Sequence, residues 1–357
     1  MDARRWSRRE FLTYTGAVAV TASMGPFVPV RHAKGAQELV FVSWGGAYQD
    51  SQREAHIKPF MKATGVRVVE IKEGPRIAKL KAMVESGNVE WDVIDFETSD
   101  MLRAAQAGLL EPIDKKMVDT SDILPSGRHE YAVANISWST VMAFNTKKYP
   151  PGKPRPVGWQ EFWDVKKWPG PRGLQDLVKT NLEYALLADG VPKEKLYPLD
   201  VDRAFKSLDR IRPHINVWWA KGAQPPQLLA DGAVDLCSAY NGRIFSARKE
   251  GAPVDLDWTG GTLDYDWWCV PKGTKKRELA MKFVAFAIQP EGQAELTKHI
   301  SYGPTNQKAW AHVDKATAPH LPTAPENFPK QVVLNNEYWL EHEAKLIERW
   351  EAWKLKK

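Results

Sequence analysis

The sequence predicts an α/β fold with two domains, and two observations carry that prediction. Between residues 38 and 108, apolar runs of strand length alternate with amphipathic stretches, an order typical of parallel strands joined by helices. The chain has 357 residues, which is more than the roughly 250–300 residues that one hydrophobic core usually serves. We therefore expect two α/β units, each with its own core.

The first unit has a regular rhythm of strand, turn and helix. Gly45-Gly46 has the composition of a turn, and Gly108 is placed to end a helix. Strands are expected at residues 39–43, 67–71 and 91–96, and helices at residues 50–63, 76–86 and 99–108.

Prolines then interrupt the pattern between residues 147 and 169, which indicates a crossing into a second unit. In that unit strands are expected at residues 215–219, 233–240 and 263–270, and helices at residues 183–189, 202–210, 225–231 and 275–288.

The amino terminus has the pattern of an export signal. Ser7-Arg8-Arg9-Glu10-Phe11-Leu12 precedes a weakly apolar stretch, which is typical of the twin-arginine pathway, and small residues predict cleavage after Gly35. Residues 1–35 hold six basic and two acidic residues, so the formal charge of +6 falls to about +2 in the mature chain. This near balance speaks against a nucleic-acid-binding protein, and we expect periplasmic localisation.

No later stretch has the 18 or so apolar residues that a membrane span needs. The chain has two cysteines, Cys237 and Cys269, both in apolar runs that could be neighbouring strands. One disulfide and two buried thiols are both compatible with an oxidising compartment. Nothing near them has metal-ligand spacing.

Aromatic residues, including 16 tryptophans, recur beside carboxylates at expected strand ends and turns. This mixture suits an alkylammonium group, because carboxylates accept its N–H donors while aromatic faces hold the cation and its methylenes. The segments concerned are residues 43–48, 96–99, 238–243, 264–267 and 301–306.

In this order these segments resemble the spermidine/putrescine-type periplasmic binding proteins of ABC transporters, most specifically in Tyr240-Asn241-Gly242, Asp266 and residues 302–306. The resemblance implies an α/β, two-lobed type II periplasmic-binding-protein fold. Each lobe would be a mixed sheet flanked by helices, with the ligand cleft between the lobes. It places lobe 1 at residues 36–144 plus 266–311 and lobe 2 at residues 145–265 plus 312–357. It also implies a monomer without a cofactor, whose partners are a small amine ligand and an ABC permease with its ATPase.

The resemblance also implies ligand-binding residues. Aromatic wall positions of the family match Trp44, Tyr48, Tyr240 and Tyr302, and the carboxylate that binds an amine matches Asp266. An ordinary core position is the alternative for Trp44, Tyr48 and Tyr240.

Departures from the family indicate a rebuilt pocket. Glu97 stands where the family often has serine, Ser99 where it often has tyrosine, and Asp264 where it often has tryptophan. For Glu97 and Asp264 a salt bridge or helix cap is the alternative. Asp176 is the nearest match to a second acidic site.

Arg243 is an unusual residue for a purely cationic ligand, because it would repel one, whereas a ligand carboxylate would suit it. The Gly45-Gly46 turn before a helix also favours an anionic group. The sequence thus predicts a receptor for a polyamine or related small amine, with a zwitterionic amine such as an amino-acid derivative or opine-like solute as the alternative.

Two other functions are less well supported. Asp264 and Asp266 could divide acid and base roles, but no nucleophile–base pair, metal triad or phosphate loop accompanies them, so we expect no enzyme. Tyr48, Tyr240 and Tyr302 are available to a ferric-iron receptor, but adjacent tyrosine pairs are missing.

Overall fold

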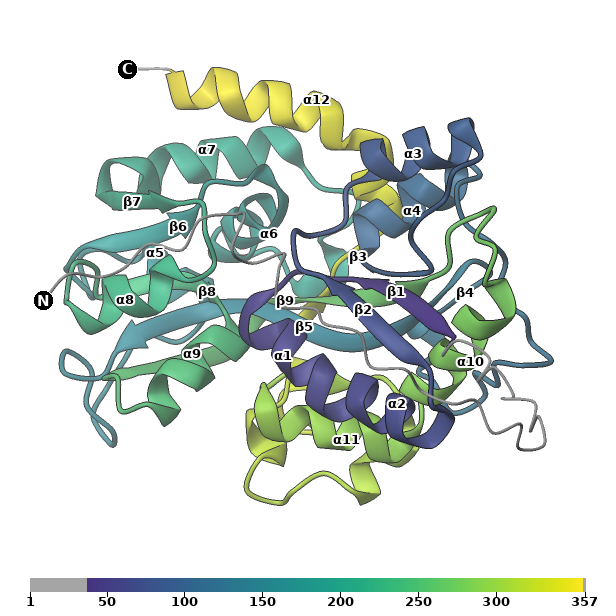
Figure 1. The fold of residues 1–357 in the computed structure, drawn as a ribbon. Coiled ribbons are helices and arrows are strands. Elements are labelled where there is room, and N and C mark those ends of the chain that lie inside the picture. The colour runs from purple at the N-terminus through teal and green to yellow at the C-terminus, as the bar shows by residue number, and fades with distance from the viewer. Residues whose placement is uncertain (1–36, 356–357) are drawn as a thin grey trace, which may run out of the picture. The chain divides into compact units, whose positions relative to one another are not determined.

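The structure is a computed structural model that describes residues 37–355, and the predicted signal segment 1–35 lies outside them. In this part of the chain the strands form one mixed sheet flanked by helices (Figure 1). The strands are β1 (Glu38–Val42), β2 (Arg67–Ile71), β3 (Val93–Glu97), β4 (Arg128–His129), β5 (Ala132–Asn145), β6 (Arg172–Gln175), β7 (Ile215–Trp219), β8 (Leu236–Tyr240), β9 (Val254–Cys269), β10 (Gly303–Pro304) and β11 (Val332–Val333).

Helices cover the sheet, and a π-helical stretch, Arg53–Ile57, joins the first two of them. The helices are α1 (Gly46–Gln52), α2 (Lys58–Thr64), α3 (Ile77–Ser86), α4 (Thr98–Gln106), α5 (Gly158–Trp163), α6 (Val178–Ala188), α7 (Val201–Ile211), α8 (Gln224–Ala230), α9 (Asn241–Lys249), α10 (Arg277–Ala287), α11 (Pro290–His299) and α12 (Asn336–Leu355). None of these helices is long and apolar enough to cross a membrane.

The sheet has the strand order β2-β1-β3-β9-β5-β8-β6-β7. As the strand–helix alternation predicts, β1 is parallel to β2 and β3, and β6 is parallel to β7 and β8. The sheet as a whole is mixed, as expected from the resemblance, because β9 runs antiparallel to β3 and β5, and β5 runs antiparallel to β8. The two long strands β5 and β9 therefore join the parallel groups at the middle of the sheet.

Two of the three lobe boundaries predicted from the sequence fall on these strands: one is at the end of β5, after Phe144, and another is inside β9, before Asp266. The third follows Ala311, outside the strands. The β5–β9 ladder shifts register between Ala134 and Ile136 and again between Thr140 and Met142. Such irregularities bend a strand and increase its twist. The division into lobes stays a prediction.

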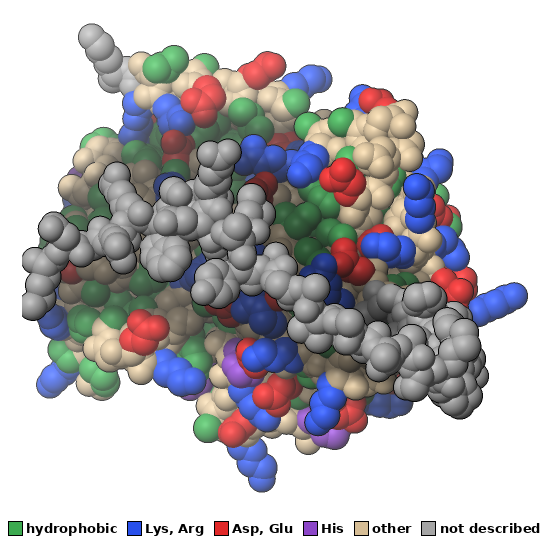
Figure 2. Space-filling model, in the orientation of Figure 1, with side chains coloured by type: hydrophobic (Ala, Val, Ile, Leu, Met, Phe, Trp, Pro, Cys, Tyr) green, Lys and Arg blue, Asp and Glu red, His purple; other side chains and the backbone are tan. Residues whose placement is uncertain are grey.

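Apolar side chains are buried on both faces of the sheet. Trp267 and Trp268 are neighbours on β9, so they point to opposite faces, and each is buried in a different apolar cluster. A third cluster holds α12 against the rest of the fold through Trp339, Trp350 and Trp353. The side chains on the visible surface are of mixed charge, with basic and acidic groups interspersed (Figure 2).

The two cysteines are free and buried. They do not lie on neighbouring strands, because β5 separates β8 from β9 in the sheet. Cys237 pairs with Ala143 of β5, whereas Cys269 pairs with Ala132 near the other end of that strand. At about 3.3 Å per residue this places the thiols on the order of 30 Å apart, so the disulfide alternative is wrong.

Candidate functional site

Strand ends and helix starts from both parallel groups meet at one cavity of about 240 Å³. This is below the roughly 300–1,000 Å³ of sites for drug-sized ligands, so it suits a small solute. Seven of the ten residues predicted from the sequence line it. The lining residues are Trp44, Tyr48, Glu97, Trp138, Gly222, Tyr240, Arg243, Asp266 and Tyr302.

Two carboxylates form an acidic side of the cavity. Glu97 ends β3 and is the cross-strand partner of Asp266 on β9, so the two side chains are neighbours. Asp266 accepts a hydrogen bond of 2.8 Å from Nε1 of Trp138. In the described part of the chain neither carboxylate has an ion pair, although like charges directly opposite one another destabilise a sheet.

The surroundings of these carboxylates favour their neutral forms. Loss of water around Glu97 raises its pKa to about 7; the ammonium of Lys179 opposes the shift, and Asp264 adds to it. The Glu97 side chain keeps exposed surface within the cavity, so a ligand can still reach it. Burial also raises the pKa of Asp266 well above its usual value, with repulsion from Asp95 and Glu97 adding to the effect. A cation placed between them would reverse both shifts.

Arg243 brings a positive charge to the same cavity from the first turn of α9. Its position is set by Asn241, whose Oδ1 accepts from the backbone N–H of Ser139 at 2.9 Å and whose Nδ2 donates to the carbonyl of Ser301 at 2.6 Å. Within residues 37–355 no carboxylate lies within ion-pair distance of Arg243. Its guanidinium is therefore free to bind an anion.

Aromatic rings form the remaining walls. Tyr48 packs edge-on against Tyr302 with ring centroids 5.6 Å apart, and Trp138 packs in the same way against Tyr240 at 5.4 Å. Trp44 keeps 37% of its surface exposed. These faces can hold methylenes or an alkylammonium group.

Two glycines let the tyrosine rings lie against the backbone. A Cβ added to Gly242 would come within 2.6 Å of the Tyr302 ring, and one added to Gly222 within 2.7 Å of the Tyr240 ring. The close approach of the Tyr302 ring to the backbone therefore explains why Tyr240-Asn241-Gly242 ends in glycine.

A buried carboxyl group, Asp95, supports the acidic side from behind. It accepts hydrogen bonds from Ser43 at 2.9 Å, Gln52 at 2.7 Å and Asn135 at 2.9 Å. Burial raises its pKa to about 6, and these donors limit the rise. Asn135 in turn accepts from the hydroxyl of Tyr48 at 3.3 Å, which fixes the wall aromatic relative to the sheet.

The other three predicted residues do not line this cavity. Ser99 and Asp264 both accept hydrogen bonds from Lys179. Asp176 accepts from Lys354 at 2.7 Å and from the indole of Trp350 at 3.1 Å, and so helps hold α12.

Trp138 and Gly222 were not predicted from the sequence, because neither stands beside a carboxylate at an expected strand end. The Gly45-Gly46 turn was expected to favour an anionic group. There, the backbone N–H of Gly45 already donates to Oε1 of Gln49 at 3.0 Å.

The model of the bacterial extracellular solute-binding protein family matches residues 55–323. A gamma-aminobutyric acid-binding protein of Pseudomonas aeruginosa is 42% identical over 323 residues, which are 89% of this chain and 91% of the relative. A spermidine/putrescine-binding periplasmic protein of Escherichia coli is 23% identical over 350 residues, with 94% and 93% of the two chains covered.

Solved structures share the fold. The structure of a GABA receptor superposes with a TM-score of 0.82 at 38% identity, covering 90% of this chain and 98% of the other. A periplasmic binding protein of Agrobacterium tumefaciens R10 in complex with agropinic acid gives a TM-score of 0.76 at 40% identity, covering 90% and 99%. This chain therefore belongs to the bacterial extracellular solute-binding proteins and is the substrate-binding component of an ABC transporter, a receptor and not an enzyme.

Proposed function

We propose that this receptor binds a small zwitterion with an ammonium group at one end and a carboxylate at the other, of the ω-amino acid class that includes gamma-aminobutyric acid. One observation carries the proposal: the cavity is lined by Glu97 and Asp266 and by Arg243, and these opposite charges do not pair with one another in the described part of the chain. Each side lacks the counterion that such a ligand supplies.

The chemistry of the lining assigns each end of the ligand. The ammonium group would be bound by Glu97 and Asp266, and the carboxylate by the guanidinium of Arg243, which presents a fork of N–H donors. The hydroxyl of Tyr302 lies within electrostatic reach of both sides, because its pKa of about 12 is lowered by Arg243 and raised by Asp266 and Glu97, after a larger effect of burial. The aromatic walls would enclose the methylenes between the two ends.

The polyamine interpretation, which was the main expectation from the sequence, has weaker support. Relatives named for spermidine or putrescine are 22–25% identical, whereas the relative named for gamma-aminobutyric acid is 42% identical. Arg243 would repel the second ammonium of a diamine. The ferric-iron alternative is disfavoured because burial raises the pKa of Tyr48, Tyr240 and Tyr302, so phenolate ligands are costly.

Calorimetry of the purified mature protein with gamma-aminobutyrate, 5-aminovalerate, putrescine and spermidine tests the proposal. We expect an ω-amino acid to bind at least ~10-fold more tightly than putrescine. Arg243→Gln should weaken amino acid binding by roughly 10- to 150-fold, since a hydrogen bond between charged groups is worth about 1.5–3 kcal/mol, and should leave putrescine binding unchanged or improved.

Arg248→Gln is the matched control, because Arg248 lies on the same helix but pairs with Asp255 outside the cavity. Its amino acid affinity should equal that of the unmodified protein. Tighter binding of putrescine than of every amino acid by the unmodified protein would contradict the proposal.

We further infer export through the twin-arginine pathway, and monomeric action with a permease and its ATPase. The motif Ser7-Arg8-Arg9 and the extracellular nature of the family support export. Replacing Arg8 and Arg9 by lysine in a reporter fusion should abolish it.

A further inference from the structure

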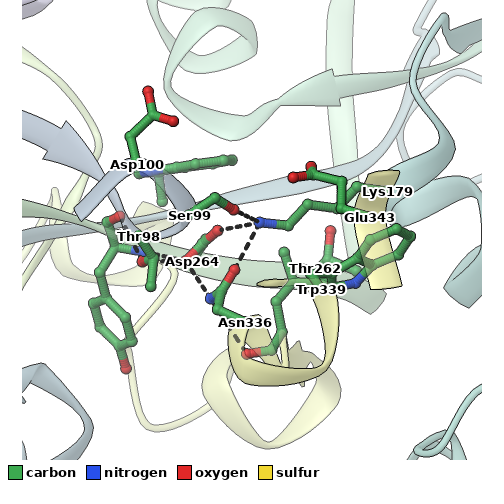
Figure 3. Close-up of polar contacts among 12 residues, drawn as sticks. Thr98, Ser99, Asp100, Lys179, Thr262, Asp264, Asn336, Trp339 and Glu343 are labelled. Carbon is green, nitrogen blue, oxygen red and sulfur yellow. Dashed lines mark hydrogen bonds and ion pairs between the residues drawn. The ribbon is translucent and has the colours of Figure 1, made fainter. Parts of the chain in front are cut away.

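A second charged cluster lies beside the cavity on the same face of β9. Asp264 precedes Asp266 by two residues, so both side chains point to one face about 6–7 Å apart. Here the ammonium of Lys179 donates to Oγ of Ser99 at 2.9 Å, to Oδ2 of Asp264 at 3.2 Å and to Oδ1 of Asn336 at 2.6 Å (Figure 3). We call Lys179, Ser99, Asp264 and Asn336 the lysine cage.

The cage is complete without a ligand. An ammonium group has three N–H donors, and Lys179 uses all of them. The other oxygen of Asp264 accepts from Oγ1 of Thr98 at 2.6 Å and from Nδ2 of Asn336 at 2.9 Å. Asp264 is 2% exposed and Lys179 is 8% exposed, so water has little access.

An unusual backbone directs Lys179 into the cage. Lys179 has an extended ψ of 141° at the start of α6, and the next residue, Thr180, has a φ of 73°. Thr180 is the one residue other than glycine with a positive φ in residues 37–355. β-branched residues rarely adopt this conformation, so the surrounding structure must hold it. Asn181 does part of this by donating to the carbonyls of Gln175 and Leu177, each at 2.7 Å.

The cage directly adjoins the acidic side of the cavity. Glu97, which lines the cavity, is followed in the chain by Thr98, which donates to Asp264 of the cage, and by Ser99, which belongs to the cage. The carboxyl group of Glu97 also interacts electrostatically with both charges of the cage, since Lys179 lowers its pKa and Asp264 raises it.

We propose that the ammonium of Lys179 is a built-in cation that occupies an acidic subsite next to the ligand cavity, and that it thereby excludes linear diamines and sets the length of the ligand. The subsite, made by Asp264, Ser99 and Asn336, has acceptors suited to a primary ammonium group. With Lys179 in place, a ligand can use Glu97 and Asp266 but finds no second site for a cation. This proposal deepens the proposed function and rests on the same cavity.

The proposal predicts that a variant without the positive charge of Lys179 binds diamines more tightly. Lys179→Met keeps most of the length of the side chain but leaves the Asp264 carboxylate without its cation. We expect at least ~10-fold tighter binding of putrescine, cadaverine or spermidine by calorimetry, with a change below ~3-fold for gamma-aminobutyrate. The double variant Lys179→Met/Asp264→Asn is the matched control, and it should lose the gain because the subsite no longer carries a charge.

Two results overturn the proposal: unchanged diamine binding by folded Lys179→Met, or an equal gain in the double variant. If Lys179→Met does not fold alone, it is refolded with putrescine or with gamma-aminobutyrate. Rescue by the diamine alone supports the proposal, and failure of the diamine to rescue folding overturns it. Failure of the proposed function is distinguishable, since it appears in the unmodified protein as a preference for putrescine.

Discussion

The ligand cavity and the lysine cage are neighbouring clusters built from the same kinds of side chain, and they differ in where the counterion comes from. In the cage, Asp264 has Lys179 as a partner and every donor of the ammonium is used. In the cavity, Glu97 and Arg243 have no ion-pair partner among the described residues.

The physical reason for the difference is the cost of a buried charge without a partner. Such a charge is costly unless it is paired and hydrogen-bonded. At the cage the protein supplies the counterion itself, so Asp264 is paired with Lys179 and is not available to a ligand. At the cavity the protein leaves the cost in place, most clearly at Asp266, which is 4% exposed and whose pKa is raised by burial, and a ligand with the complementary charges removes it.

The largest expected effect follows from removing a charge on the cavity side. Asp266→Asn keeps an oxygen that can accept from Trp138 but loses the negative charge. Breaking a buried ion pair costs about 3–5 kcal/mol, so amine binding should fall by more than ~100-fold in calorimetry. The melting temperature should stay near that of the unmodified protein, and retained affinity would show that Asp266 does not bind the ammonium group.

The second effect is a difference in how substitutions in the cage and in the cavity change the stability of the protein. Lys179→Met should lower the free energy of unfolding by roughly 3 kcal/mol, because Asp264 is left buried without its cation. Glu97→Gln should be neutral or stabilising at pH 8. The folded pKa of Glu97, about 7, lies above the unfolded value of 4.5, so its ionisation costs stability that develops above pH 4.5 and is complete above about pH 7.

Urea unfolding of both variants without ligand measures this contrast. Equal destabilisation by Lys179→Met and Glu97→Gln would mean that the Glu97 carboxylate has a stabilising partner in the ligand-free protein.

The smallest effect is a dependence of binding on pH. Glu97 is mostly protonated below its pKa of about 7, whereas a bound ammonium favours the ionised form and lowers that pKa. Binding should therefore release protons near pH 7, and affinity should fall by roughly 10-fold between pH 8 and pH 5.5.

Glu97→Gln should flatten most of this dependence, with the remainder coming from Asp95, whose pKa is about 6, and from Asp266. Calorimetry in two buffers of different ionisation enthalpy detects the released protons. A pH profile that is the same with and without Glu97 would assign the titration to another group.

Local sequence patterns predicted the helices and strands well where each element is an independent, amphipathic or apolar run. Strand β2 was expected at residues 67–71 and is Arg67–Ile71, and helix α7 was expected at residues 202–210 and is Val201–Ile211. Strand β5 and the C-terminal helix α12 were not expected. Their burial comes from contacts with residues far away in the chain, for β5 in other strands and for α12 through its tryptophans. The local periodicity of apolar residues does not reveal such contacts.

The sequence by itself indicated the class of the molecule and seven of the nine lining residues, because aromatic and acidic residues at expected strand ends and turns resemble the binding positions of a known family. Only the tertiary structure decided which acids are free. Glu97 and Asp264 are both carboxylates beside aromatic residues, but Lys179, 85 positions from Asp264 in the chain, reaches one and not the other. Residues so far apart in the chain become partners only because the fold places α6 beside β9. The tertiary structure therefore determines which carboxylate already has a cation and which one needs a cation from the ligand.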